Sequence, residues 1–220
     1  MVVSTLNSKG IRFSAHIFRA RYNEKLRLVE RQLQFNLKAL LKVIAPSAGQ
    51  TVDAIHEFVK IAEGGSYRVF EATFIDGPAR IARLPYPCTI PRNFGVASEV
   101  ATMRYLRNQG LSVPQVFAWD ASNMNMGKNS STHGIVCKCQ RDYPLLSRLW
   151  SLEVKLFNLR LPAHGSIYFE DFLDLHNIDR TPIDSEPAGE GRFCIGPSAQ
   201  HMWWYRGRDE LTCNRGPCEF

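Results

Sequence analysis

The sequence contains none of the short motifs that assign a chemistry on their own. Its six cysteines form no C-x-x-C pair and no cysteine–histidine grouping at zinc spacing, which argues against a zinc site and a disulfide scaffold. It has neither a G-x-x-x-x-G-K-S/T phosphate loop nor a G-x-G-x-x-G fingerprint. No run reaches the roughly 18–20 apolar residues of a membrane span. What remains is a chain of 220 residues, 45% hydrophobic, long enough for one domain or two lobes.

Acidic residues are absent from the first 23 positions, which carry four basic side chains among several serines: Lys9, Arg12, Arg19 and Arg21. Residues 11–19 would form a basic amphipathic helix. This composition is typical of a mitochondrial transit peptide, and the alternative is a disordered basic tail on a cytoplasmic protein. Without these four residues the net charge of +6 falls to +2, so we expect no nucleic-acid partner. Nothing in the sequence identifies a protein partner.

Residue periodicity predicts an α+β fold. Residues 22–45 carry an apolar stripe at helical spacing, which Asn36 could interrupt as a second N-cap. A helix around Glu99 follows the third of the predicted strands. After Trp150 the pattern weakens, and we expect a short helix at 151–159 followed mostly by loop. The five predicted strands are 57–62, 69–74, 79–84, 115–119 and 134–139.

Arg83 and Glu99 are the most informative pair in the chain. Arg83 lies in the third predicted strand, with Ile81 on the same side and Arg80 on the other. Glu99 lies on or beside the apolar face of its helix, where a carboxylate needs a partner. Kinase-like folds hold a nucleoside triphosphate with such a strand cation, fixed by a helix carboxylate. The alternative is an exposed strand arginine and an ordinary solvated glutamate.

Gly64 and Gly65 separate the first two predicted strands. In a kinase-like lobe a glycine-containing turn at this place covers the phosphates. Two glycines between strands are nevertheless more often simply a hairpin turn with positive φ. Asp76 and Gly77 predict a second tight turn, which leads into the strand of Arg83.

Several ordered sequence blocks are shared with one family. They cover most of residues 18–217 and comprise residues 22–31, 62–65, 81–85, 97–103, 113–116, 162–169, 192–197 and 214–217. In these blocks the chain resembles fungal aminoglycoside-phosphotransferase-like proteins, in the subgroup of altered inheritance of mitochondria protein 9. The resemblance implies a protein-kinase-like small lobe, made of a five-stranded antiparallel sheet plus one helix, with an incomplete second lobe.

The resemblance also divides the chain and assigns its site. The expected parts are a basic N-terminal segment (1–23), an N-terminal helix (24–50), a kinase-like lobe (51–142) and a partial, largely loop-like second lobe (143–220). ATP and Mg²⁺ are the implied cofactors. In this subgroup an arginine commonly takes the strand-three cation position. The matching nucleotide-binding positions are Gly64, Gly65, Ile81, Arg83, Glu99, Lys138 and Cys139.

Departures from the family concern the hinge and the catalytic residues. Lys138 and Cys139 replace a Glu-Lys pair at the hinge, where backbone groups mainly hold the adenine. In the family, a longer helical stretch lies between the positions that match Trp150 and residue 151. In this chain that stretch is lacking. The catalytic loop, H-x-D followed by Asn, and the later metal-binding Asp would lie beyond residues 216–217. We interpret the superficial candidates as loop residues and assign no catalytic or metal-binding residue; these candidates are Asp171, Asp174, His176 and Asn177.

Three functional hypotheses follow. The first is an ATP-dependent phosphotransferase acting on small hydroxylated substrates, as the resemblance implies. The second is a kinase-like module that binds a nucleotide or a protein without catalysis. The third is a truncated gene product without function. Because phosphoryl transfer needs an acceptor-positioning Asp and metal ligands, we expect an inactive chain with weak ATP binding.

The basic segment generates the first testable prediction. The full chain with a C-terminal fluorescent reporter should enter mitochondria. Replacing Arg12, Arg19 and Arg21 with Glu should abolish import, because a transit peptide depends on positive charge along an amphipathic helix. The matched control replaces the same three residues with Lys and should retain import. Unchanged localisation of the Glu variant in fluorescence microscopy would contradict the transit-peptide interpretation.

Overall fold

The computed structural model describes residues 24–89, 91–121, 134–138, 152–184, 191–204 and 208–219. The predictions for residues 1–23, for Cys139 and for Trp150 therefore lie outside the described residues. The chain forms two compact units. The first comprises Met1–Thr89 and Phe117–Cys139, and the second comprises Ile90–Val116 and Gln140–Phe220.

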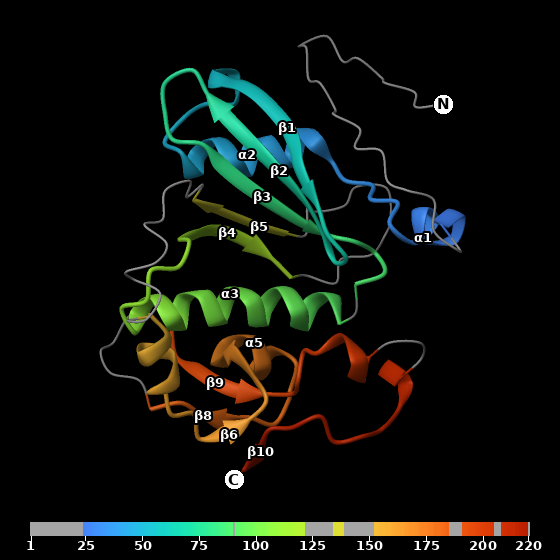
Figure 1. The fold of residues 1–220 in the computed structure, drawn as a ribbon, viewed down its shortest axis with the longest axis vertical. Helices are drawn as coiled ribbons and strands as arrows, with labels where there is room; N and C mark the ends of the chain where they lie inside the picture. The colour runs from blue at the N-terminus through green and yellow to red at the C-terminus, as the bar shows by residue number, and fades with distance from the viewer. Residues whose placement is uncertain are drawn as a thin grey trace. The chain divides into compact units, whose positions relative to one another are not determined.

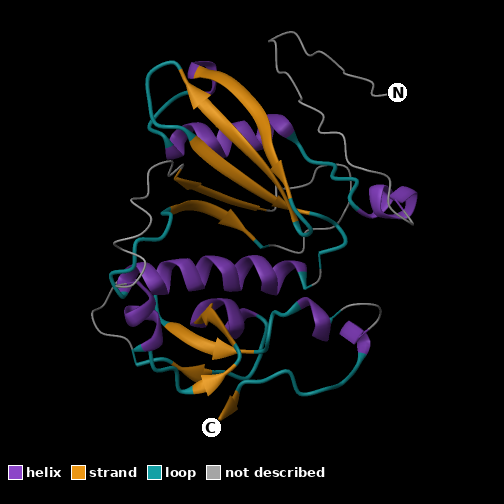
Figure 2. Ribbon diagram, viewed as in Figure 1, coloured by secondary structure: helices purple, strands orange, loops and turns teal. Residues whose placement is uncertain are grey.

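The first unit is built on a five-stranded sheet with the order β1-β2-β3-β5-β4 (Figures 1 and 2). The pairs β1–β2, β2–β3 and β3–β5 are antiparallel. All five predicted strands are present, which confirms the α+β class and the antiparallel sheet. Its elements are α1 (Glu24–Glu30), α2 (Leu37–Ser47), η1 (Val52–Ala54), β1 (Ile55–Glu63), β2 (Tyr67–Phe74), β3 (Arg80–Pro85), β4 (Val116–Asp120) and β5 (Gly134–Lys138).

Asn36 separates the two N-terminal helices, as its N-cap character predicts. Its backbone is extended, and its side-chain oxygen accepts a hydrogen bond of 3.1 Å from the backbone N–H of Ala39. This bond satisfies one of the N–H groups that a helix start leaves without a partner. The N-terminal helix expected over 24–50 is therefore two helices, with the second N-cap at Asn36 as predicted, and the second helix packs on the sheet.

Alternation along the strands places one apolar face of the sheet against α2. The aromatic rings of Phe58 and Phe70 stack there with centroids 5.0 Å apart. Burying each large apolar side chain stabilises the fold by about 1.5–3 kcal/mol. The buried residues of this core are Leu40, Ile44, Ala45, Phe58, Phe70, Ala72, Phe74, Ala82, Leu84 and Val136.

Arg80 is a buried cation on the same face, only 5% exposed. Its Nε and one terminal nitrogen donate to the carbonyl oxygen of Ser47, at 3.1 and 2.6 Å, at the end of α2. Its guanidinium carbon also lies 4.3 Å from the centre of the Phe117 ring. Burial lowers the pKa of Arg80. The contacts therefore offset the cost of burying its charge.

The second unit contains its own helices and short strands. Strands β7, β9 and β8 form an antiparallel sheet in that order, and β10 pairs with β6. Residues 152–157 are helical. The other elements are α3 (Arg92–Asn108), β6 (Ala163–His164), β7 (Ser166–Phe169), α5 (Glu170–Leu175), β8 (Thr181–Pro182), β9 (Phe193–Gly196), η2 (His201–Trp203), η3 (Arg208–Glu210) and β10 (Cys218–Glu219).

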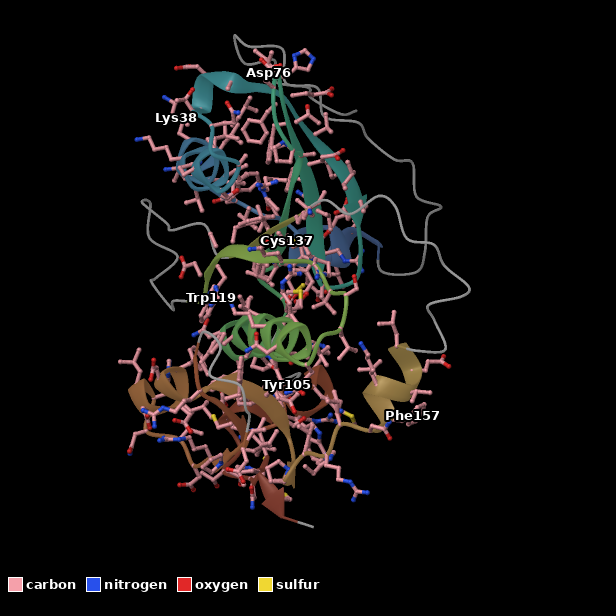
Figure 3. The ribbon with its side chains drawn as sticks, turned by 90° about the vertical axis from the view of Figure 1, so that its left-hand side faces the viewer. Lys38, Asp76, Tyr105, Trp119, Cys137 and Phe157 are labelled. Carbon is pink, nitrogen blue, oxygen red and sulfur yellow. The ribbon has the colours of Figure 1, made fainter. Side chains whose placement is uncertain are left out.

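The expectation of a largely loop-like C-terminal part was wrong. This part has a buried core that includes Tyr105 of α3 (Figure 3), together with Ile167, Phe193 and Ile195. Strands of two to four residues are too short to show an alternating pattern. Helix α3, which the sequence analysis grouped with the first lobe, makes this core in the second unit. In the described part of the chain, none of the helices combines the length and apolar character needed to cross a bilayer.

The buried Arg80 generates a prediction about stability. Arg80→Met should lower the free energy of unfolding by about 1–3 kcal/mol, because the carbonyl of Ser47 loses its charged donor. The matched control is Lys38→Met, at an exposed position on α2, which should change stability by less than about 0.5 kcal/mol. Urea unfolding measures both. Equal midpoints for the two variants would contradict the role assigned to Arg80.

Candidate functional site

The turn between β1 and β2 contains Gly64 and Gly65. The N–H of Gly64 donates to the carbonyl oxygen of Tyr67 at 3.0 Å and closes the turn. Neither glycine adopts a positive φ, so the expectation of a positive-φ hairpin was wrong. A Cβ on Gly65 would meet nothing within 4 Å, and one on Gly64 would meet only the oxygen of Tyr67 at 3.8 Å. The fold itself therefore does not require glycine at these two positions.

Glu63, the last residue of β1, is the centre of a hydrogen-bonded network at the base of this turn. One carboxylate oxygen accepts from Arg68 at 2.8 Å and from the hydroxyl of Tyr86 at 2.7 Å. The other accepts from Lys60 at 2.9 Å. The network joins β1, β2 and the residue that follows β3.

The electrostatics of the network fix the protonation state of its members. Burial opposes the charge on Glu63, but the hydrogen bonds from Lys60, Arg68 and Tyr86 outweigh it and lower the pKa of Glu63 to about 2. Burial and the neighbouring carboxylate raise the pKa of Tyr86 to about 12. At neutral pH Glu63 is therefore an anion and Tyr86 a protonated donor.

The register places this network on the α2 side of the sheet. Arg68 pairs with Leu84, and Lys60 pairs with Phe70, and both apolar partners belong to the core under α2. The guanidinium of Arg31, which lies between α1 and α2, is 5.9 Å from the ring of Tyr86. The network therefore braces the turn from the α2 side. Sequence reasoning missed it, since Tyr86 carries no local signal.

Arg83 lies on the opposite face of β3. It pairs in register with Val69 and Ile135, while the neighbouring Ala82 and Leu84 point into the core. Its guanidinium carbon is 4.8 Å from the centre of the Tyr67 ring. Because Tyr67 is the first residue of β2 after the turn, this contact holds the cation beside the glycines.

The other predicted site residues are placed as follows. Ile81 lies on the face of Arg83 and pairs with Glu71 and Cys137. Lys138 is exposed at the end of β5. Glu99 is half-buried on α3, which belongs to the second unit. Arg83 belongs to the first unit, so the ion pair between them stays a prediction.

The superficial catalytic candidates lie on and after α5, so the interpretation of Asp171 and Asp174 as loop residues was wrong. Asp174 forms an ion pair with Arg180. A ring nitrogen of His176 lies 2.8 Å from the carbonyl oxygen of Phe172. Asn177 follows His176, the C-cap of the helix, and has a φ of 51°. All four candidates are exposed, and within the described ranges no three His, Cys, Asp or Glu side chains gather as a metal site would require.

Comparison with known proteins identifies homologues. The chain is 32% identical to a subtelomeric hrmA-associated cluster protein of Aspergillus fumigatus over 180 residues, covering 76% of this chain and 34% of the relative. It is 25% identical to altered inheritance of mitochondria protein 9, mitochondrial, of Saccharomyces cerevisiae over 187 residues, covering 70% and 28%. The chain thus spans about a third of the length of the curated relatives it matches. No protein-family model and no solved structure matches it.

The Glu63 network generates a prediction about pH. The pKa of Glu63 is lowered, so its stabilisation is fully present above pH about 4.5 and is lost as the pH falls through about 2. Glu63→Gln should cost about 1–3 kcal/mol at pH 7, and the difference from the parent should shrink below pH 4.5. The control is Glu57→Gln, at an exposed position on the same strand. Thermal unfolding between pH 2 and 7 tests this, and a difference independent of pH would contradict the assignment.

Proposed function

We propose that this chain carries the nucleotide-binding part of a kinase-like phosphotransferase homologue. The phosphates of ATP lie against the turn at Gly64 and Gly65, and Arg83 binds them through its guanidinium. Glu99 fixes Arg83, and the backbone at Lys138 and Cys139 holds the adenine. What supports the proposal is the strand order, with a glycine turn between its first two strands and a cation on the third.

The strongest support for the proposal comes from Gly65. Gly65 has open space where a side chain would stand and an ordinary backbone conformation, so packing gives no reason for its glycine. Close approach of a ligand to the backbone is such a reason. The Tyr67 ring holds Arg83 beside this turn. A guanidinium binds phosphate with two parallel donors, and backbone N–H groups of a turn add to it.

The residues present fit a nucleotide better than its metal. Mg²⁺ is commonly held by one or two carboxylates together with the phosphates, and Glu99, the one carboxylate among the residues assigned to the nucleotide site, is assigned to Arg83. The sequence also contains no H-x-D motif. We therefore assign the chain binding without phosphoryl transfer on its own. A mitochondrial location belongs to the proposal, supported by the name of the yeast relative and by the basic first 23 residues.

The proposal predicts a separation of binding from folding. Gly65→Val should leave the melting temperature within about 2 °C of the parent, because the added side chain meets open space. It should weaken binding of a fluorescent ATP analogue by blocking the backbone. Arg83→Met should weaken the same binding roughly tenfold, which corresponds to one charged hydrogen-bonded contact.

The control variants distinguish an effect on nucleotide binding from an effect on folding. Arg83→Lys keeps a single positive charge and should fall between the parent and Arg83→Met. Gly134→Ala should instead impair folding, since its Cβ would lie 2.6 Å from the carbonyl oxygen of Arg83. Phosphorylation of a hydroxylated acceptor by the parent should stay at the level of a no-protein blank. Equal analogue affinity in the parent, Gly65→Val and Arg83→Met would overturn the nucleotide assignment.

A further inference from the structure

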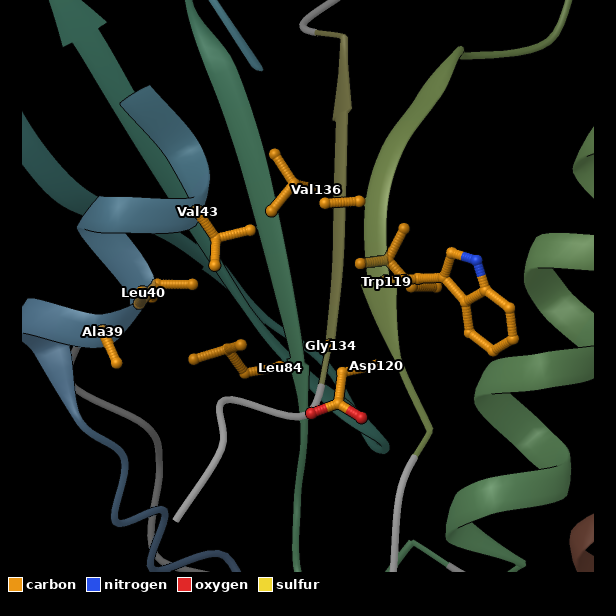
Figure 4. Close-up of a pocket in the computed structure, with 10 residues that line it drawn as sticks. Ala39, Leu40, Val43, Leu84, Trp119, Asp120, Gly134 and Val136 are labelled. Carbon is orange, nitrogen blue, oxygen red and sulfur yellow. The ribbon is translucent and has the colours of Figure 1, made fainter. Parts of the chain in front are cut away.

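A cavity lies on the face of the sheet opposite Arg83. This cavity of about 260 Å³ opens between α2 and strands β3, β5 and β4 of the first unit (Figure 4). Leu40 and Val43 of α2 form one wall, and Val136 of β5 forms part of the other. Leu40 and Leu84 are each 2% exposed, so the floor of the cavity belongs to the apolar core.

Small residues keep this space open. Ala39, Ala118 and Gly134 line it from three different elements, and none of them has a side chain larger than a methyl group. Gly134 cannot be enlarged, since a Cβ there would lie 2.6 Å from both the carbonyl oxygen of Arg83 and a methyl group of Leu84. The close approach of β5 to β3 therefore fixes one end of the cavity.

The polarity of the cavity is one-sided. Among the described residues that line it, Asp120 is the single charged side chain, and the others are apolar or aromatic. Figure 4 shows the Asp120 carboxylate beside Gly134, at one end of the apolar walls. Sites of this kind bind an apolar body and fix its orientation with one polar group. The charge of Asp120 favours a cation and disfavours a carboxylate.

We propose that this cavity binds a small amphiphilic amine. The apolar body lies between Leu40, Leu84 and Val136, and the protonated nitrogen faces Asp120. The volume lies below the range of roughly 300–1,000 Å³ that is typical of drug-sized ligands, so the ligand has the size of one ring with a short chain. The site is independent of the proposed nucleotide site, because Leu84 and Val136 point to the α2 side while Arg83 points away from it.

The test is a titration of the full-length, nitrogen-15-labelled chain followed by NMR. The probes are 2-phenylethylamine, its neutral isostere 2-phenylethanol and the anion phenylacetate. The amine should shift the backbone signals of Ala39, Ala118 and Gly134 in a saturable manner, and the alcohol should bind roughly two- to fivefold more weakly, as a partly exposed ion pair implies. Phenylacetate should leave these signals unchanged.

Substitutions test whether Asp120 causes the preference for the amine over the alcohol. Asp120→Asn should make the amine and the alcohol bind equally, whereas Glu57→Gln, at an exposed acid elsewhere on the sheet, should preserve the preference. Ala118→Leu should abolish binding of both, and Ala39→Leu fills the same space from α2 if the first variant does not fold. Absence of localised shifts, equal binding of amine and alcohol by the parent, or an amine preference that survives Asp120→Asn would each overturn the proposal.

Discussion

The side-to-side alternation of β3 is the constraint on which the first unit depends. This strand is paired on both edges, so its register with β2 and β5 is fixed. Arg80, Ala82 and Leu84 consequently face α2, and Ile81 and Arg83 face the other way. A slip of one residue would turn Arg83 into the apolar core and expose Ala82, which the core cannot accommodate. The same register holds Arg83 beside the glycine turn.

The charges on the α2 side of the turn have a structural role. Lys60 and Arg68 are engaged by the Glu63 carboxylate, so their charges stabilise the base of the turn. A partly buried carboxylate with three donors is a rigid unit, because displacing any donor breaks a hydrogen bond to a charged group. The hairpin is thus held on the α2 side, and the proposed ligand meets it on the side of Arg83. Few atoms pack against the two glycines. The Glu63 network therefore keeps the turn in a defined position.

Much of the first unit could be predicted from the sequence, because its signals are local. Long alternating strands and the N-cap at Asn36 produce patterns visible within a few residues. In the second unit the helix around Glu99 and the short helix at 152–157 could also be predicted, but the strands of two to four residues could not, because they show no period. The Glu63–Tyr86 bond links residues 23 positions apart and has no local signature. The positive φ expected at Gly64 and Gly65 was wrong because a glycine doublet indicates permissive backbone, not the conformation adopted. The Arg83–Glu99 pair stays a prediction.

The two proposed sites share β3 yet need not influence each other. Arg83 and Leu84 are adjacent in sequence but face opposite ways, so a ligand against Leu84 can move Arg83 only by displacing the backbone of β3. That backbone is held by ladders on both edges and by the close contact at Gly134. Coupling between two ligands requires an element with two arrangements that both ligands bias. A strand paired on both edges is poorly suited to this, so occupancy of the α2-side cavity should leave the affinity for the nucleotide unchanged.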